Sequence, residues 1–126
     1  MIKAGRRNAV RHVQRATFHS VNGLRGAARS ETAVRIEIAL IILALPLGIA
    51  LAPSAAWYVG MIAVLLATLA VELLNTAIEK LADHVTLERH PAIGFVKDLG
   101  SAAVLCMIVA SGLMWGVAAM LRAGWL

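Results

Sequence analysis

Acidic and amide side chains recur within one short stretch, VELLNTAIEKLAD, which covers residues 71–83. On a helix at roughly 100° per residue, one face carries Glu72, Asn75, Glu79 and Asp83. An ionised carboxylate at the bilayer centre costs roughly 2.5–3.5 kcal/mol even on lenient insertion scales. A stripe of acids that ends an apolar run should therefore face protein, water or a ligand, and we interpret it as a candidate site. The alternative is a helix that has left the membrane at Glu72 and turns a charged face to solvent.

Polar residues from two other predicted helix ends would meet this stripe: Glu31 before the first apolar run, and Lys97 and Asp98 before the last. Mg²⁺ is usually held by one or two carboxylates together with substrate phosphates, and a lysine at a helix N-terminus suits phosphate. A carboxylate at interfacial depth, such as Glu72, could accept a proton from a lipid hydroxyl. These residue types indicate phosphoryl transfer, which depends on positioning and charge neutralisation. The sequence has neither a Walker-type Gly-x-x-x-x-Gly-Lys motif nor a kinase Gly-rich loop.

The composition predicts an all-α integral membrane protein. The chain has 126 residues, of which 60% are hydrophobic, and its mean hydropathy is +0.80. Spans of about 20 residues cross a bilayer, so we expect transmembrane helices at residues 33–52, 55–83 and 98–121, divided first at Pro53. The segment 86–95 contains Pro91 and Gly94 and is predicted to be a loop. We expect one domain over residues 1–126, and a single cysteine, Cys106, excludes an intrachain disulfide.

The first 30 residues form a basic arm with no acid before Glu31. Apolar residues recur at 3- and 4-residue spacing while arginines gather on another face, which predicts an amphipathic surface helix over residues 1–30. Such a helix would lie at anionic headgroups. Gly23 and Gly26 suggest a bend near its end. The rival interpretation is a nucleic-acid arm, but no binding motif or aromatic interleaving supports it. No signal peptide is expected either.

Ser30 is predicted to cap the first span, with Glu31 in its first turn. An i,i+4 ion pair between Glu31 and Arg35 would explain both residues without any function. Lys and Arg number seven in the arm, three near the 72–97 stripe and loop, none at Pro53 and one, Arg122, at the C-terminus. The positive-inside rule therefore predicts a cytoplasmic N-terminus and an acidic site on the cytoplasmic face of the inner membrane.

Two sequence stretches, VELLNTAIEKLAD and VKDLGSAAVL, together with NGLRGAARSETAVRIE, closely resemble the bacterial integral-membrane diacylglycerol kinases and the related undecaprenol kinases. The resemblance covers nearly the whole chain. It implies a homotrimer, each subunit with an N-terminal surface helix and three spans, and composite active sites at the cytoplasmic interface. The implied reaction is the ATP- and Mg²⁺-dependent phosphorylation of diacylglycerol to phosphatidic acid.

The resemblance also implies a role for each matching residue. Glu72 would be the general base, and Glu31 and Glu79 would hold Mg²⁺ with the ATP phosphates. The ATP site would be completed by Asn75, Lys97 and Asp98, with Arg35 and Glu37 on the nucleotide side. Lipid contacts would come from Glu72, Lys97 and, in the arm, Arg11, Arg15, Ser20 and Arg25. The arm departs from the family pattern at His19 and Asn22.

Three other functions are compatible with parts of the sequence. An undecaprenol kinase is favoured by His84-Val85-Thr86 and His90-Pro91, whereas the stretch that starts at Lys97 resembles the diacylglycerol kinase branch, which we favour. A small transport subunit would use Glu72 as a proton or cation site, but Thr68 is then the only polar candidate deeper in that span. A scaffold protein would leave the acidic stripe unexplained. His84 and His90 have no further Cys or His ligand nearby, so no metal pair is expected there.

Overall fold

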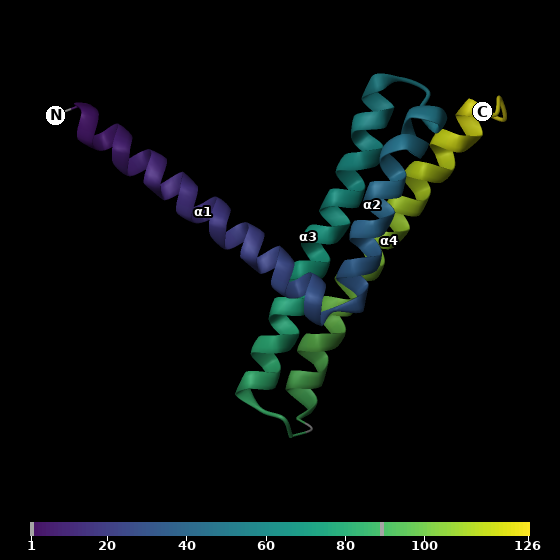
Figure 1. The fold of residues 1–126 in the computed structure, drawn as a ribbon. Coiled ribbons are helices and arrows are strands. Elements are labelled where there is room, and N and C mark those ends of the chain that lie inside the picture. Colours follow the sequence, from purple (N-terminus) through teal and green to yellow (C-terminus); the bar gives the residue numbers. More distant parts are fainter. Residues whose placement is uncertain (1, 89) are drawn as a thin grey trace.

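The structure, a computed structural model, describes residues 2–88 and 90–126, with side chains from residue 11 onward. The elements described are four α-helices (Figure 1): α1 at Ile2–Ser30, α2 at Thr32–Leu51, α3 at Ala55–Val85 and α4 at Pro91–Arg122. The three later helices are each long and apolar enough to cross a membrane. The prediction of three spanning helices preceded by an N-terminal helix is therefore confirmed, and the spans begin or end within a few residues of the predicted bounds except at the start of α4.

The helix lengths divide the bundle into two levels. The 20 residues of α2 rise about 30 Å, which matches the hydrocarbon core of a bilayer. The 31 residues of α3 and the 32 of α4 rise more than 45 Å. In Figure 1, α3 and α4 run past the junction of α1 and α2 and close in a hairpin beyond it. The acidic end of α3 thus extends past the beginning of α2.

The bundle is organised around α3, which packs along both α2 and α4, whereas α2 and α4 touch over a short stretch. Few side chains are wholly enclosed: Val34, Met61 and Ala118 have no exposed surface. The Trp115 indole donates to the backbone carbonyl of Met61 at 3.1 Å and links α4 to α3. Most other apolar side chains of α2 to α4 point outward. Such a surface suits lipid or neighbouring helices, since lipid tails are as apolar as the side chains themselves.

The arm is one unbroken helix that leaves the bundle at the start of α2 (Figure 1). The suggested bend at Gly23 and Gly26 is wrong. Glycine lowers helix propensity by about 1 kcal/mol but keeps its N–H donor, so the hydrogen-bond ladder continues through it. The apolar residues Val13, Val21 and Leu24 are exposed along α1, as expected of a helix that has a membrane to cover its apolar stripe. The side chains of Lys3, Arg6, Arg7 and Arg89 lie outside the described residues.

Two predicted helix ends are wrong. The segment 86–95 is not all loop, because α4 begins at Pro91, with Pro in its first turn and the His90 imidazole accepting from the Ala92 N–H at 3.3 Å. Proline fits the first turn because its fixed φ is helical and its missing N–H would have no helical partner. Ser30 does not cap α2. It is the last residue of α1, and its hydroxyl donates to the Ala27 carbonyl at 3.5 Å.

Candidate active site

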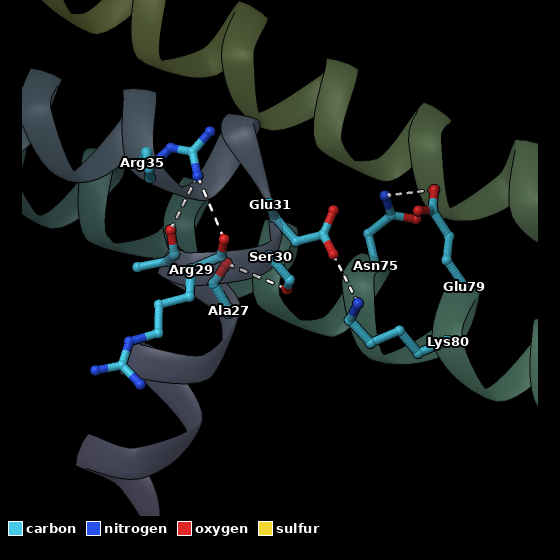
Figure 2. A network of polar contacts seen from close by, with 9 residues as sticks. Ala27, Arg29, Ser30, Glu31, Arg35, Asn75, Glu79 and Lys80 are labelled. Carbon is cyan, nitrogen blue, oxygen red and sulfur yellow. Dashed lines mark hydrogen bonds and ion pairs between the residues drawn. The ribbon is translucent and has the colours of Figure 1, made fainter.

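Glu31 is the single non-helical residue between α1 and α2, and its side chain reaches α3. Its Oε1 accepts a hydrogen bond and ion pair from Lys80 Nζ at 2.7 Å (Figure 2). This hydrogen bond is the main reason that the pKa of Glu31 lies below its usual value. Glu31 makes no side-chain capping bond to α2. Helix capping therefore does not explain this carboxylate, which instead ties the arm's junction to the acidic helix.

Arg35 does not pair with Glu31, so the predicted i,i+4 pair is wrong. Its guanidinium points back to the end of α1 and donates to the carbonyls of Ala28 and Arg29 at 3.5 and 3.4 Å (Figure 2). It also donates to Thr32 Oγ1 at 2.9 Å. A guanidinium placed on carbonyls at a helix C-terminus also complements the helix dipole. Arg35 thus holds the end of α1 against the start of α2 and leaves the Glu31 carboxylate to Lys80.

Asn75 and Glu79 continue the site along α3. Asn75 Nδ2 donates to Glu79 Oε1 at 3.2 Å, and in Figure 2 both side chains lie on the side of α3 that Glu31 faces. Asn75 Oδ1 is buried without a hydrogen-bond partner among the described residues. Gly100 of α4 lies directly against this oxygen, and a Cβ at that position would overlap it. A side chain at residue 100 would therefore force either the Asn75 amide or α4 to shift.

Glu72 lies deeper, in an apolar groove. The groove has a volume of about 340 Å³ and is walled by α2, α3 and α4, with Glu37 and Glu72 among its lining residues. Glu72 is 8% exposed, and one carboxylate oxygen of Glu37, Oε2, is buried with no hydrogen-bond partner in the described part of the chain. Glu72 precedes Lys80 by eight residues, about 12 Å along α3, and Glu37 follows Glu31 by six, about 9 Å along α2. Both carboxylates therefore lie inward of the Glu31–Lys80 contact, at similar depth.

Lys97 lies toward the hairpin. Its Nζ contacts Asp83 Oδ1 at 2.5 Å, and both residues line a second hollow with His90 and Pro91. The expectation of a lysine at a helix N-terminus is wrong, because α4 begins six residues earlier at Pro91. Asp98 is exposed. Sequence reasoning thus placed Lys97 and Asp83 on the correct side of the bundle but missed their pairing.

The structure separates the arm residues from the rest of the predicted site. Arg11 and Arg15 line a shallow hollow on α1 with Gln14 and Phe18. Ser20 donates its hydroxyl to the Ala16 carbonyl at 3.0 Å. Arg25 is exposed on the same helix. Within this one chain, α1 meets α2 and α3 at its C-terminal end, so the predicted lipid contacts of the arm remain a prediction.

Comparison with known proteins identifies the family. The sequence model described as "Prokaryotic diacylglycerol kinase" matches residues 18–119. The chain belongs to the prokaryotic diacylglycerol kinase family. It is 37% identical over 105 residues to the diacylglycerol kinase of Haemophilus influenzae, an alignment that covers 83% of this chain and 89% of that protein. It is 39% identical to the Pseudomonas aeruginosa diacylglycerol kinase, with 84% and 86% covered. For the Escherichia coli K12 enzyme the identity is 37%, with 80% and 83% covered.

Family membership confirms the resemblance found in the sequence and makes the chain an ATP-dependent lipid kinase. The matched range includes Glu31, Glu72, Glu79 and Lys97 but begins after Arg11 and Arg15. The family match therefore covers all the predicted site residues of α2 to α4.

The donor set of the site is compatible with Mg²⁺. Among the described residues no group of three or more His, Cys, Asp or Glu side chains converges on one point. A site for Mg²⁺ does not need such a group, since one or two carboxylates and the phosphates of a nucleotide usually suffice. Glu31 and Glu79 each use only Oε1 in the hydrogen bonds of this site. Their chemistry therefore fits the ion, and Asn75 Oδ1 is a further hard oxygen that has no hydrogen-bond partner among the described residues.

Two features of the site were not found from the sequence. Lys80 lies off the acidic stripe of α3 and pairs across to Glu31, a partner that the helical spacing of the stripe does not indicate. Thr68 was taken as the only polar candidate deeper than Glu72, but its hydroxyl lies 2.8 Å from that of Ser111 in α4. A spacing rule within one helix cannot find partners that are 49 or 43 residues apart.

Proposed function

We propose that this protein phosphorylates diacylglycerol to phosphatidic acid with ATP and Mg²⁺, as a single lipid-kinase domain over residues 1–126. The observation that carries the proposal is the position of Glu72. It lies in an apolar groove, inward of a cluster of oxygens and cations at the α1–α2 junction, in a chain of the diacylglycerol kinase family. A lipid that occupies the groove would present its hydroxyl to Glu72 while the cluster faces the nucleotide.

Glu72 acts as the general base. Its carboxylate accepts the proton of the lipid hydroxyl as the lipid oxygen forms a bond to the γ-phosphorus of ATP and the bond to ADP breaks. General base catalysis of this kind typically contributes 10²- to 10⁴-fold. Burial at 8% exposure keeps competing water away from the carboxylate, which favours transfer to lipid over hydrolysis.

Glu31, Glu79 and Asn75 form the phosphate side of the proposed site. Glu31 and Glu79 would hold Mg²⁺, which supplies charge neutralisation for the phosphates when bound. Asn75 orients Glu79 through its 3.2 Å hydrogen bond. Lys80 and Glu31 form an ion pair. When a nucleotide binds, its phosphates would contact Lys80 in place of the Glu31 carboxylate.

Four more residues complete the proposed nucleotide site. Lys97 and Asp98 lie on α4 beside the hairpin. Lys97 would contact both the nucleotide and the lipid headgroup. Arg35 and Glu37 lie on α2 and are assigned to the nucleotide side by the family resemblance; Glu37 also lines the groove beside Glu72, so it would lie where the nucleotide and lipid meet. On the arm, lipid contacts are proposed for Arg11, Arg15, Ser20 and Arg25. The arginines would meet anionic headgroups, at about 1 kcal/mol each.

The proposed assembly is a homotrimer in the bacterial inner membrane, with the site on the cytoplasmic face. The distribution of Lys and Arg supports this orientation, since the far link at Pro53 has none. The outward apolar faces of α2 to α4 would meet lipid or the other subunits. Chemical cross-linking in membranes tests the trimer. Labelling of single cysteines placed at Glu88 and Ser54, in a Cys106→Ala background, tests the orientation.

The direct test is ATP turnover by the purified protein in mixed micelles that contain diacylglycerol or undecaprenol. We expect turnover of both acceptors, because apolar grooves discriminate poorly between apolar tails. Of the two, diacylglycerol should have the higher kcat/KM. A preference for undecaprenol would reverse the acceptor and leave the kinase mechanism intact. Proton or cation flux in proteoliposomes without lipid phosphorylation would instead support the transport subunit.

A further inference from the structure

The groove that contains Glu72 also contains a pair of hydroxyl groups. Its lining residues are apolar except for Glu37 and Glu72 and, further along, Thr68 and Ser111. Thr68 is 5% exposed and Ser111 is 8% exposed, so both are more than nine-tenths buried. Thr68 precedes Glu72 by four residues, which is one turn or about 6 Å along the same face of α3. A molecule that brings an oxygen to Glu72 and continues inward therefore meets these hydroxyls next.

The hydrogen bonds of the pair assign its two protons. Thr68 Oγ1 lies 2.8 Å from the carbonyl of Val64, the usual bond of a helical threonine to the carbonyl four residues back. A hydroxyl has one proton to donate, so in the 2.8 Å contact between Thr68 and Ser111 the donor is Ser111. Thr68 is the acceptor and keeps its bond to the helix backbone.

Ser111 differs in this respect from three other helical hydroxyls. Thr17, Ser20 and Thr68 each donate to a backbone carbonyl of their own helix. In the part of the chain that the structure describes, Ser111 Oγ has one hydrogen-bond partner, Thr68 Oγ1. When the Ser111 proton turns toward the groove, Thr68 can turn its own proton to Ser111 Oγ, since either hydroxyl can be the donor in their contact. The Val64 carbonyl then still accepts its helical N–H bond.

We propose that Ser111, oriented by Thr68, donates a hydrogen bond to an ester carbonyl of the lipid acceptor and so selects glycerol esters over polyprenols. This inference rests on the proposed kinase function and names its acceptor class. In a diacylglycerol, the first ester is carried by the carbon next to the one that bears the free hydroxyl. With that hydroxyl at Glu72, the ester enters the groove just where the Ser111 hydroxyl lies. A polyprenol has only hydrocarbon there, so its entry leaves two buried hydroxyls paired with each other and gains no hydrogen bond.

The apolar residues support the same occupant. Around the hydroxyl pair the groove is lined by Leu40, Ile41, Leu65 and Ile108, which suit an acyl chain. The groove thus combines carboxylates, a hydroxyl pair and hydrocarbon, the three kinds of contact that the hydroxyl, ester and acyl chain of a diacylglycerol need.

The test compares two short-chain acceptors, dioctanoylglycerol and the matching dioctylglycerol diether, which differ only in the ester carbonyls. One hydrogen bond contributes roughly a three- to tenfold preference, so the wild-type protein should use the diester with a kcat/KM higher by that factor. Ser111→Ala should bring the ratio of diester to diether close to one. Thr68→Val should lower the ratio as well, because Ser111 then loses the hydroxyl that donates to it while its own proton is on the ester.

Two matched variants keep the hydroxyl groups. Ser111→Thr and Thr68→Ser should retain most of the preference for the diester, which separates hydrogen bonding from packing. The inference is overturned if the wild-type ratio is already near one, or if Ser111→Ala slows both acceptors equally. The wild-type comparison needs no variant to fold. If neither acceptor is phosphorylated, the proposed kinase function fails; if both are used equally, only the ester selection fails.

Discussion

The two ends of the bundle use their polar side chains in different ways. At the far end, near the link between α2 and α3, polar side chains donate to backbone carbonyls of other helices. Tyr58 donates to the Leu45 carbonyl at 3.3 Å, and Arg122 donates to the Ala50 carbonyl at 3.2 Å. Such bonds compensate groups that lipid cannot satisfy.

At the site end, Arg35 also donates to backbone carbonyls, but two pairs of charged side chains bind one another across elements. Glu31 pairs with Lys80, and Asp83 pairs with Lys97. Glu37 Oε2 and Asn75 Oδ1 are buried there without partners among the described residues. Pairs between titratable side chains can exchange one charged partner for another, whereas a bond to backbone cannot move without disturbing a helix. The far end of the bundle is therefore stabilised by fixed bonds to backbone, whereas the site end carries charged side chains that can change partners when a ligand binds.

The largest expected effect is at Glu72. Glu72→Gln keeps the shape and removes the base, so we expect the fold and ATP binding to persist while turnover falls by 10² or more. Turnover in mixed micelles and nucleotide binding are the measurements. A variant that retains more than about a tenth of the wild-type rate would show that Glu72 is not the general base.

Gly100→Ala should have the next largest effect. Its Cβ would overlap Asn75 Oδ1, so either α4 or the amide must shift, at about 1–3 kcal/mol. We expect turnover to fall about tenfold and thermal stability to drop. The control is Gly112→Ala on the same helix, where nothing lies within 4 Å of the added methyl group. Equal effects of the two substitutions would mean that the approach of α4 to Asn75 is unimportant.

Glu31→Gln and Glu79→Gln should each raise the Mg²⁺ concentration needed for half-maximal turnover, because each removes one charged oxygen from a site with few protein ligands. A Mg²⁺ titration at fixed ATP measures the shift, which we expect to be several-fold. Lys80→Met provides the contrast, because it removes the Glu31 ion pair but no oxygen. If Lys80→Met and Glu31→Gln change Mg²⁺ dependence alike, Glu31 acts through the ion pair.

The smallest effect on activity is expected at the far side of the bundle. Trp115→Phe removes the indole donor to the Met61 carbonyl and should lower stability by about 1 kcal/mol while turnover stays near the wild-type value. Thermal unfolding in detergent and the micelle assay measure the two quantities. A large loss of turnover without a loss of stability would show that this part of the bundle also contributes to activity.

Much of the fold could be predicted from the sequence because a bilayer imposes simple lengths. The predicted span 33–52 differs from the observed α2, Thr32–Leu51, by one residue at each end. The start of α4 was predicted seven residues too late, because Pro91 and Gly94 were taken as loop signals. Proline is common both in loops and in the first turn of a helix, so its presence does not distinguish the two. The observed helix start is marked by the His90 imidazole, which accepts from the Ala92 N–H.

The candidate site was predictable where chemistry follows a helix face and unpredictable where it crosses between helices. Glu72, Asn75 and Glu79 share a face of α3, and the spacing alone found them. The partners Lys80 for Glu31 and Ser111 for Thr68 depend on how α2 and α4 are set against α3. No local pattern contains that information.

Because Glu31 is the one non-helical residue between α1 and α2, a small rotation there would displace the far end of α1. The 29 residues of α1 extend about 43 Å, so a rotation of about 10° at Glu31 would carry the far end by roughly 7 Å. The same residue that forms this joint is anchored to α3 through Lys80. If an ion or nucleotide competes for the Glu31 carboxylate, as proposed, it would act at the residue from which α1 projects, where a small rotation displaces the far end of the arm by several ångström.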